Sequence, residues 1–186
     1  MHAGKNAHPH DYVALSYLCI QLVSSGGAEA LDFANQVESS IQQGKSDFTG
    51  VRIGFLGLFD PVDSINALRN DAGNLNIKVP NGIAHVADAV ALSENRYLFN
   101  WINLIGSPNT TVVGFMGAHS DIGGGYGNDP LSNTTLHWMM SQAAAAGLVF
   151  TTMYPGLFNG YATAQVHDSY ATHAKLHQNT NTCCIA

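Results

Sequence analysis

Serine, aspartate and histidine side chains follow three apolar stretches of the sequence, in that order. Ser24 and Ser25 follow one apolar stretch of sequence. Asp60 follows a second such stretch, and His119 follows a third. A serine hydroxyl becomes an effective nucleophile when an imidazole removes its proton, and a carboxylate holds that imidazole in the required tautomer. These residue types therefore predict acyl-transfer chemistry, provided that the fold brings them together.

A glycine-rich segment follows His119. An apolar run over residues 110–117 ends just before the histidine, and Asp121, Gly123, Gly124 and Gly125 come after it. Consecutive glycines cost conformational entropy, so they indicate backbone that needs positive φ or close approach. We expect Asp121 and the first two glycines to support the site. Three roles are open for Asp121: capping the loop, binding a cation or orienting His119.

Strands and helices alternate in a way that would gather these side chains. Apolar runs predict buried strands over residues 17–23, 51–59 and 110–117. Apolar spacing of three and four residues predicts helices over residues 28–43, 85–94 and, with a cap at 131–133, up to Gly147. Residues 96–105 form either a further strand or an extended connection. The predicted fold class is α/β, with a mostly parallel sheet flanked by helices, and the carboxyl ends of its strands share one edge.

Composition narrows the classes of function. The net charge of −6, with only seven scattered Lys and Arg residues among 186, argues against nucleic-acid binding. Three cysteines without zinc-type spacing indicate neither a metal site nor a disulfide framework, and no cofactor is expected. Residues 1–10 lack a signal-peptide core, and no apolar run reaches membrane-spanning length. We expect a soluble chain, cytoplasmic or secreted without a classical signal peptide.

The two ends of the chain differ in character. We expect residues 1–150 to form the core of the fold and residues 151–186, rich in Gly, Asn, Thr and His, to form a mostly irregular tail. The last four residues, Cys183, Cys184, Ile185 and Ala186, satisfy the formal pattern for prenylation. No basic segment precedes them, and one lipid chain alone anchors a protein only marginally.

Four segments carry a resemblance to a known family: residues 22–35, 55–62, 85–96 and, above all, 117–126. Over about residues 17–150 the sequence resembles the catalytic domain of phospholipase effectors of type VI secretion systems and related uncharacterised α/β-hydrolases of bacteria and fungi. The resemblance implies a partial α/β-hydrolase fold, with Ser24 as nucleophile, Asp60 as acid, His119 as base and the amide of Ser25 in the oxyanion hole. It also implies a lipase- or phospholipase-like activity on lipid esters, with transient contact with a membrane surface.

The sequence also differs from this family, and the differences keep alternatives open. The family has glycine two positions before the nucleophile, where this chain has Leu22, and it has further strands upstream, so we expect a chain truncated at its N-terminus. Ser25 is the alternative nucleophile and His167 the alternative base. One alternative function is a degenerate or truncated, non-catalytic domain. A second is a metal-dependent hydrolase that uses Asp60, His119 and Asp121, with His85 nearby. Of the remaining polar residues, His85, Asp88 and Arg96 are expected to be structural or to support the site.

Overall fold

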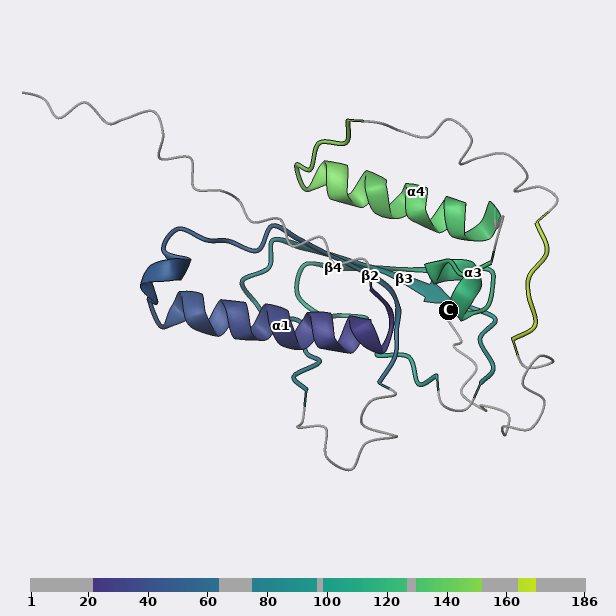
Figure 1. Cartoon of the computed structure of the whole chain (residues 1–186), viewed down its shortest axis with the longest axis horizontal. Coiled ribbons are helices and arrows are strands. Elements are labelled where there is room, and N and C mark those ends of the chain that lie inside the picture. Colours follow the sequence, from purple (N-terminus) through teal and green to yellow (C-terminus); the bar gives the residue numbers. More distant parts are fainter. Residues whose placement is uncertain (1–21, 64–74, 97–98, 127–129, 152–163, 170–186) are drawn as a thin grey trace, which may run out of the picture.

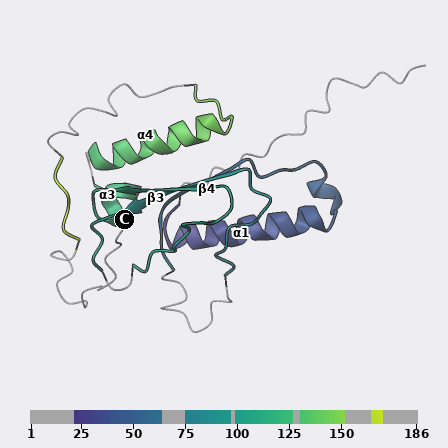
Figure 2. The same ribbon diagram turned by 180° about the vertical axis from the view of Figure 1, so that it is seen from behind.

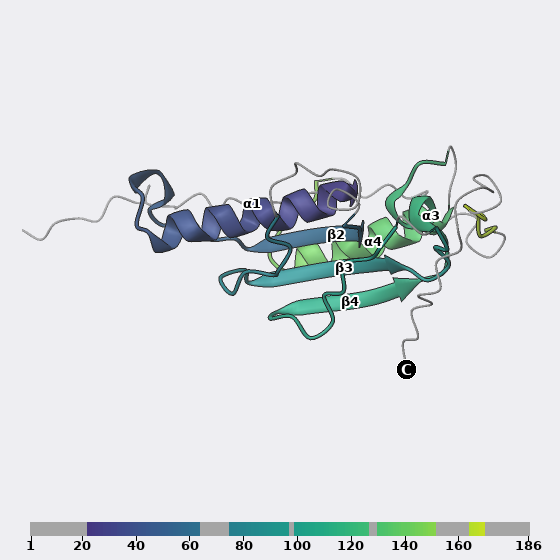
Figure 3. The same cartoon turned by 90° about the horizontal axis from the view of Figure 1, so that it is seen from below.

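The computed structural model describes residues 22–63, 75–96, 99–126, 130–151 and 164–169 (Figure 1). Its elements, in chain order, are β1 (Leu22–Ser24), α1 (Ser25–Gln42), the 3-10 helix η1 (Ser46–Phe48), β2 (Phe55–Pro61), β3 (His85–Ala91), β4 (Thr110–Phe115), α3 (His119–Gly123) and α4 (Pro130–Ala145). The strands form one sheet in the order β1-β2-β3-β4, and every neighbouring pair is parallel. Figure 3 shows β2, β3 and β4 side by side. The predicted fold class is confirmed.

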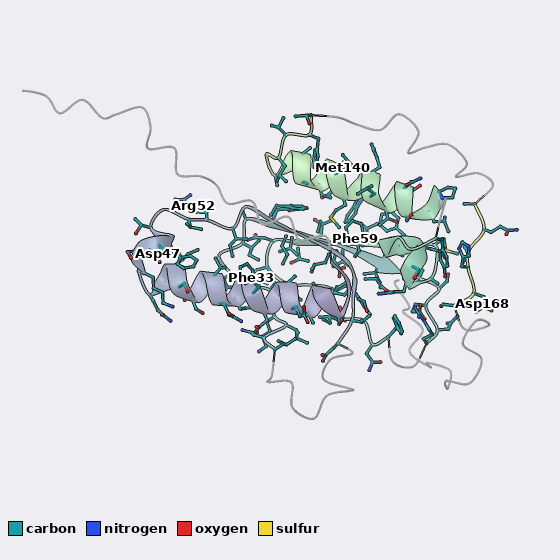
Figure 4. All side chains as sticks on the ribbon, in the orientation of Figure 1. Phe33, Asp47, Arg52, Phe59, Met140 and Asp168 are labelled. Atoms are coloured by element: carbon teal, nitrogen blue, oxygen red, sulfur yellow. The ribbon has the colours of Figure 1, made fainter. Side chains whose placement is uncertain are left out.

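Helices cover the sheet on both faces. In Figures 1 and 2, α1 lies on one side of the sheet and α4 on the other. Leu31 and Ala34 of α1 pack with Leu56 and Leu58 of β2 in one buried cluster. On the opposite face, Met139 and Ala143 of α4 pack with Phe55, Phe59 and Ala87. The side chains in Figure 4 fill both layers, with Phe59 on the side of α4. Burial on both faces is why these strands are apolar without alternation.

The prediction of a helix over residues 85–94 is wrong. Residues 85–91 form β3, which pairs with β2 on one side and β4 on the other. Val86, Ala89 and Val90 show helical spacing, but residues 86–91 are all buried between the two helical layers. A central strand covered on both faces has no polar face, so its sequence lacks the alternation that identifies a strand.

The other boundaries differ less from prediction. The second strand begins at Phe55 instead of residue 51, and α4 begins at Pro130, before the predicted cap. At the end of α4, Gly147 adopts φ 101° and its N–H donates to the carbonyl of Ala144 at 2.9 Å, as expected for a glycine that closes a helix. Residues 99–105 are an extended connection, bridged to Val62 through Trp101.

Several predictions lie outside the described residues. They are the first part of the predicted strand at 17–21, the cysteines at 19, 183 and 184, and nearly all of the predicted tail. Residues 164–169 of that tail are described, and they contain neither helix nor strand. Within the described parts of the chain, no helix is long and apolar enough to cross a membrane.

Candidate active site

Ser24 occupies a sharp turn between strand and helix. It is the last residue of β1, and α1 begins at the next residue, Ser25. The backbone of Ser24 has φ 71° and ψ −138°, a conformation that costs a non-glycine residue about 1–3 kcal/mol and persists only where its surroundings hold it. Its carbonyl accepts a hydrogen bond from the N–H of Val62 at 3.2 Å. A serine on a strained strand-to-helix turn is typical of the nucleophile elbow of α/β-hydrolases.

The position of Ser25 differs from that of Ser24. Ser25 is the first residue of α1, where backbone N–H groups have no acceptor within the helix. Such N–H groups, at the positive end of the helix dipole, suit a developing negative charge. The geometry thus favours Ser24 as the residue displayed by the turn and Ser25 as the donor of a backbone amide.

Asp60 and His119 form a buried hydrogen-bonded pair. Nδ1 of His119 lies 2.7 Å from Oδ2 of Asp60, and the two side chains are only 5% and 3% exposed. The other carboxylate oxygen, Oδ1, accepts from the N–H of Ala91 at 3.0 Å, so both oxygens of Asp60 have donors. An ionised carboxylate only accepts hydrogen bonds, which means that Nδ1 carries the proton and Nε2 the lone pair. The imidazole is therefore held in the tautomer that a general base requires.

The second nitrogen of this imidazole is buried without a partner. Among the described residues, Nε2 of His119 has no hydrogen-bond partner. A buried polar atom without a partner costs about 1–3 kcal/mol, so such an atom needs an explanation. A role as a base that faces a substrate or a nucleophile would explain why Nε2 of His119 has no partner.

Ser24 lies at the same edge of the sheet as this pair. Its register partner in β2 is Pro61, the residue after Asp60, and α3, which begins at His119, packs against the end of β1. The start of α1, directly after the Ser24 turn, lies very close to β2. A Cβ added to Gly27 would lie 2.5 Å from Cβ of Pro61. The structure thus brings the three predicted triad residues to one edge. It shows no hydrogen bond between Ser24 and His119 among the described residues.

Two carboxylates hold the start of α3. Oδ2 of Asp121 accepts from the N–H of Ala118 at 2.9 Å, and Oε2 of Glu94 accepts from the N–H of His119 at 3.2 Å. The first N–H groups of a helix need such acceptors. Gly117 permits the approach, since its φ is 140° and an added Cβ would lie 2.5 Å from Cβ of Asp121. Asp121 therefore caps the start of α3, the helix that precedes the glycine-rich segment.

Two of the three glycines after His119 adopt the positive φ that the sequence predicted. Gly123 is the last residue of α3, and Gly124 and Gly125 have φ 84° and 141°. These values favour glycine strongly. The segment therefore ends α3 within two turns of His119 and returns the chain toward Tyr126.

His167, the alternative base, forms a second histidine–carboxylate pair. Its Nδ1 is hydrogen-bonded to Oδ1 of Asp121, and its backbone N–H donates to Oδ2 at 3.0 Å. Its ring stacks on Tyr126, with 3.8 Å between centroids. The side chain of His167 is 43% exposed, whereas that of its carboxylate partner is fully buried. These hydrogen bonds hold residues 164–169 against α3. The pair of His167 and Asp121 is separate from the pair of Asp60 and His119.

Asp88 is a buried carboxylate in the middle of β3, which the sequence suggested as a residue that is structural or supports the site. It lies on β3, and Oδ2 accepts from Nε1 of Trp101 at 3.4 Å. Burial, and after it the charge of Asp60, raises the pKa of Asp88 well above its ordinary value, while the Trp101 hydrogen bond opposes this shift. Asp88 thus favours its neutral form.

Glu94 is a functional candidate that the sequence pattern did not reveal. Burial favours the neutral acid, but hydrogen bonds from the side chain and backbone of Arg96 and from the backbone of His119 outweigh it, and the pKa of Glu94 falls to about 2. The one signal in the sequence is the Glu-x-Arg spacing directly after β3, which places both side chains on one side of an extended segment. That spacing is too common to identify a site alone.

The residues of the metal-dependent alternative are not brought together. His85 begins β3, at the opposite end of the sheet from His119, where it stacks on Phe55 and its Nε2 lies 3.2 Å from the Gln142 amide oxygen. Asp60 and Asp121 bind different histidines. No group of three or more His, Cys, Asp or Glu residues in the described segments could hold a metal ion.

Comparisons with known proteins place the chain in a family. The family model described as type VI secretion system, phospholipase effector Tle1-like, catalytic domain matches residues 18–142. None of the curated protein sequences compared with the chain matches it. An uncharacterized protein from Pseudomonas aeruginosa, solved by crystallography, is similar over 73% of this chain, with 25% identity and a TM-score of 0.58. The structure of the Tle1 effector bound to the VgrG spike from the type 6 secretion system is similar over 59% of it, with 28% identity and a TM-score of 0.43.

The extent of these matches differs between the chain and its relatives. The chain spans 25% of the length of each of the two solved structures. The family model, in contrast, matches more than half of the 186 residues, and its match includes Ser24, Asp60 and His119. The chain belongs to the family of Tle1-like catalytic domains of type VI secretion phospholipase effectors.

Proposed function

We propose that this chain carries the triad of a serine ester hydrolase of the lipase and phospholipase type. Ser24 is the nucleophile, His119 the general base and Asp60 the acid that holds the base. The observation that carries this proposal is the buried pair of Asp60 and His119 at the sheet edge where Ser24 occupies a strained turn. Within the described segments, Nε2 of this histidine has no hydrogen-bond partner. Family membership supports lipid esters, and phospholipids first among them, as substrates.

The mechanism follows from the positions of these groups. Nε2 of His119 takes the proton of the Ser24 hydroxyl as Oγ bonds to the ester carbonyl carbon, and the carbonyl π electrons move onto oxygen. The amide of Ser25 at the start of α1 stabilises that oxyanion. The intermediate collapses, the carbon–oxygen ester bond breaks, and the imidazolium gives its proton to the leaving alcohol. Water, deprotonated by His119, then attacks the acyl-serine, and the acid is released with Ser24 restored.

The first prediction is covalent labelling of Ser24 by a fluorophosphonate, because this reaction requires an activated serine and no particular lipid. Mass spectrometry of the labelled peptide should place the probe on Ser24. Ser24→Ala should abolish labelling, and His119→Gln should slow it by at least about a hundredfold, since general-base catalysis contributes about 10²–10⁴-fold.

Two matched variants test the alternatives in the same assay. Ser25→Ala keeps the backbone amide and should label within about threefold of the unmodified chain, and His167→Gln should do likewise. A probe on Ser25, or loss of labelling in His167→Gln with retention in His119→Gln, would assign the site to the alternative residues.

A second candidate function is a non-catalytic domain of the same family. The observation in its favour is that, among the described residues, no hydrogen bond joins Ser24 to His119. A folded chain with native circular dichroism that never labels at Ser24 would support this candidate and refute the hydrolase proposal.

A further inference from the structure

We propose that Glu94, Arg96 and Phe99 form a bracket that positions the imidazole of His119 against Asp60. The inference rests on the proposed function, in which that imidazole is the general base. We call these three residues the Glu94 bracket. They follow β3 in the chain, and β3 already provides the N–H of Ala91 that orders the carboxylate of Asp60.

The first arm of the bracket acts on the backbone of His119. Oε2 of Glu94 accepts from the N–H of His119 at 3.2 Å and from Nη2 of Arg96 at 2.8 Å. Oε1 accepts from the N–H and Nε of the same arginine at 2.7 and 2.9 Å. The planar guanidinium of Arg96 therefore donates to both carboxylate oxygens of Glu94. This bidentate contact fixes both the rotation and the position of the carboxylate. Because the Glu94 side chain is only 6% exposed, water competes little for these donors.

The second arm acts on the ring of His119. The guanidinium carbon of Arg96 lies 3.4 Å from the centroid of the Phe99 ring, a cation–π contact that fixes this ring. The Phe99 ring in turn meets the imidazole edge to face, with 4.8 Å between centroids and 73° between planes. Arg96 thus contacts both Glu94 and Phe99. Glu94 holds the backbone of His119, and Phe99 limits tilting of the His119 ring.

The consequence is that His119 is restrained at three points, two on its ring and one on its backbone. Nδ1 is held by Asp60, the backbone N–H by Glu94 and the ring by Phe99. A general base must stay within hydrogen-bond reach of the proton that it removes, and a displacement of about 1 Å can cost a hundredfold in rate. Glu94 is therefore a positioning residue, because it acts on the reaction through His119.

The experiment compares four variants of the whole chain: Glu94→Gln, Arg96→Lys, Phe99→Leu and the control Glu29→Gln, which makes the same chemical change at an exposed position of α1. Two quantities are measured for each. One is the rate of Ser24 labelling by a fluorophosphonate. The other is the NMR signal of the Nδ1 proton of His119, whose downfield position and slow exchange report its hydrogen bond to Asp60. Circular dichroism verifies the fold.

We expect Glu94→Gln and Phe99→Leu to slow labelling by about tenfold or more and to broaden or lose the Nδ1 proton signal while circular dichroism is retained. Arg96→Lys keeps the charge and loses the planar grip, so its effect should be intermediate. The control should match the unmodified chain in both measurements.

The outcomes separate this inference from the function on which it rests. Unchanged labelling and an unchanged Nδ1 signal in folded Glu94→Gln would overturn the bracket. Absence of labelling in the unmodified chain would refute the hydrolase proposal, and the NMR signal would then decide the bracket alone. If Glu94→Gln does not fold, Phe99→Leu leaves the ion pair intact and carries the test: an unchanged Nδ1 signal there overturns the bracket, and its loss supports it.

Discussion

At the scale of single residues, the buried carboxylates differ in how many hydrogen-bond donors stabilise their charged form. Asp60 and Glu94 have donors on both oxygens, from Ala91 and His119 in the first case and from Arg96 and His119 in the second. Asp88 has one weak donor, from Trp101, and its Oδ1 has no partner among the described residues. A buried carboxylate without sufficient donors favours protonation. Asp88 therefore limits the negative charge next to Asp60.

This difference predicts how stability depends on pH. Because the pKa of Asp88 is raised in the folded chain, its proton contributes stability that is full below the unfolded pKa, near 3.8, and is lost as pH rises through the folded pKa. Asp88→Asn should remove that loss, so the stability of the variant relative to the unmodified chain should be higher at pH 8 than at pH 5. Urea unfolding at pH 5 and pH 8 measures it.

The control is Asp47→Asn, the same substitution at an exposed position in η1, which should change the free energy of unfolding by less than about 0.5 kcal/mol at either pH. A loss of stability in Asp88→Asn that is equal at both pH values would contradict the prediction. It would mean that packing, and not the charge of Asp88, determines how the substitution changes the free energy of unfolding.

At the scale of elements, the places of Ser24, Asp60 and His119 at or just beyond the ends of strands were predictable from sequence, because each apolar run stops at or shortly before a polar residue. The strand β3 was not, since a central strand made of Val, Ala and Asp has the spacing of a helix and only its neighbours β2 and β4 define it. The role of Glu94 was equally hidden. Besides the neighbouring Arg96, its partners are His119 and Ser169, which come from other segments, and no local pattern records them.

The contact between α1 and β2 gives a prediction at this scale. Gly27→Ala would place a Cβ 2.5 Å from Cβ of Pro61, so the start of α1 would have to move away from β2. We expect a loss of about 1–3 kcal/mol, typical of overpacking, together with slower labelling of Ser24, whose turn precedes that contact. Urea unfolding and fluorophosphonate kinetics measure the two effects.

A substitution on the exposed side of the same helix provides the comparison. Glu29→Ala should change stability by less than about 0.5 kcal/mol and leave labelling unchanged. Full stability of Gly27→Ala would show that α1 does not depend on this close approach.

At the scale of the whole molecule, one sheet separates two apolar layers. The α1 layer contains Leu31 and the α4 layer contains Met139. Both layers share the strands β2 and β3, so neither can unfold without exposing the sheet to water. We propose that residues 1–150 form this single hydrolase-like core and that residues 151–186 form a tail.

Shared strands predict one cooperative unfolding transition. Leu31→Ala and Met139→Ala should each lower the free energy of unfolding by about 2–5 kcal/mol and shift the same transition. The two tryptophans of the chain report separately: Trp101 bonds to Asp88, and Trp138 of α4 packs against Phe115 of β4. Trp138→Phe and Trp101→Phe isolate each signal in urea unfolding.

The variant Phe33→Ala controls for apolar truncation as such. Phe33 is 47% exposed, and its truncation should cost less than about 1 kcal/mol. Midpoints that differ between the two single-tryptophan chains would mean that the layers unfold independently, against the prediction.

The hydrogen bonds from the described end of the chain to the edge of the sheet have a consequence for the order of folding. Ser169 donates to Glu94 across 75 positions of sequence, and His167 binds Asp121 across 46. Contacts this distant are slow to form, and a chain emerging from the ribosome folds its earlier segments first. The described strands have all emerged once residue 115 is synthesised, but Glu94 and Asp121, which hold α3, gain their described partners Ser169 and His167 only when those residues emerge. A nascent chain thus assembles its strands well before its histidine is fully restrained.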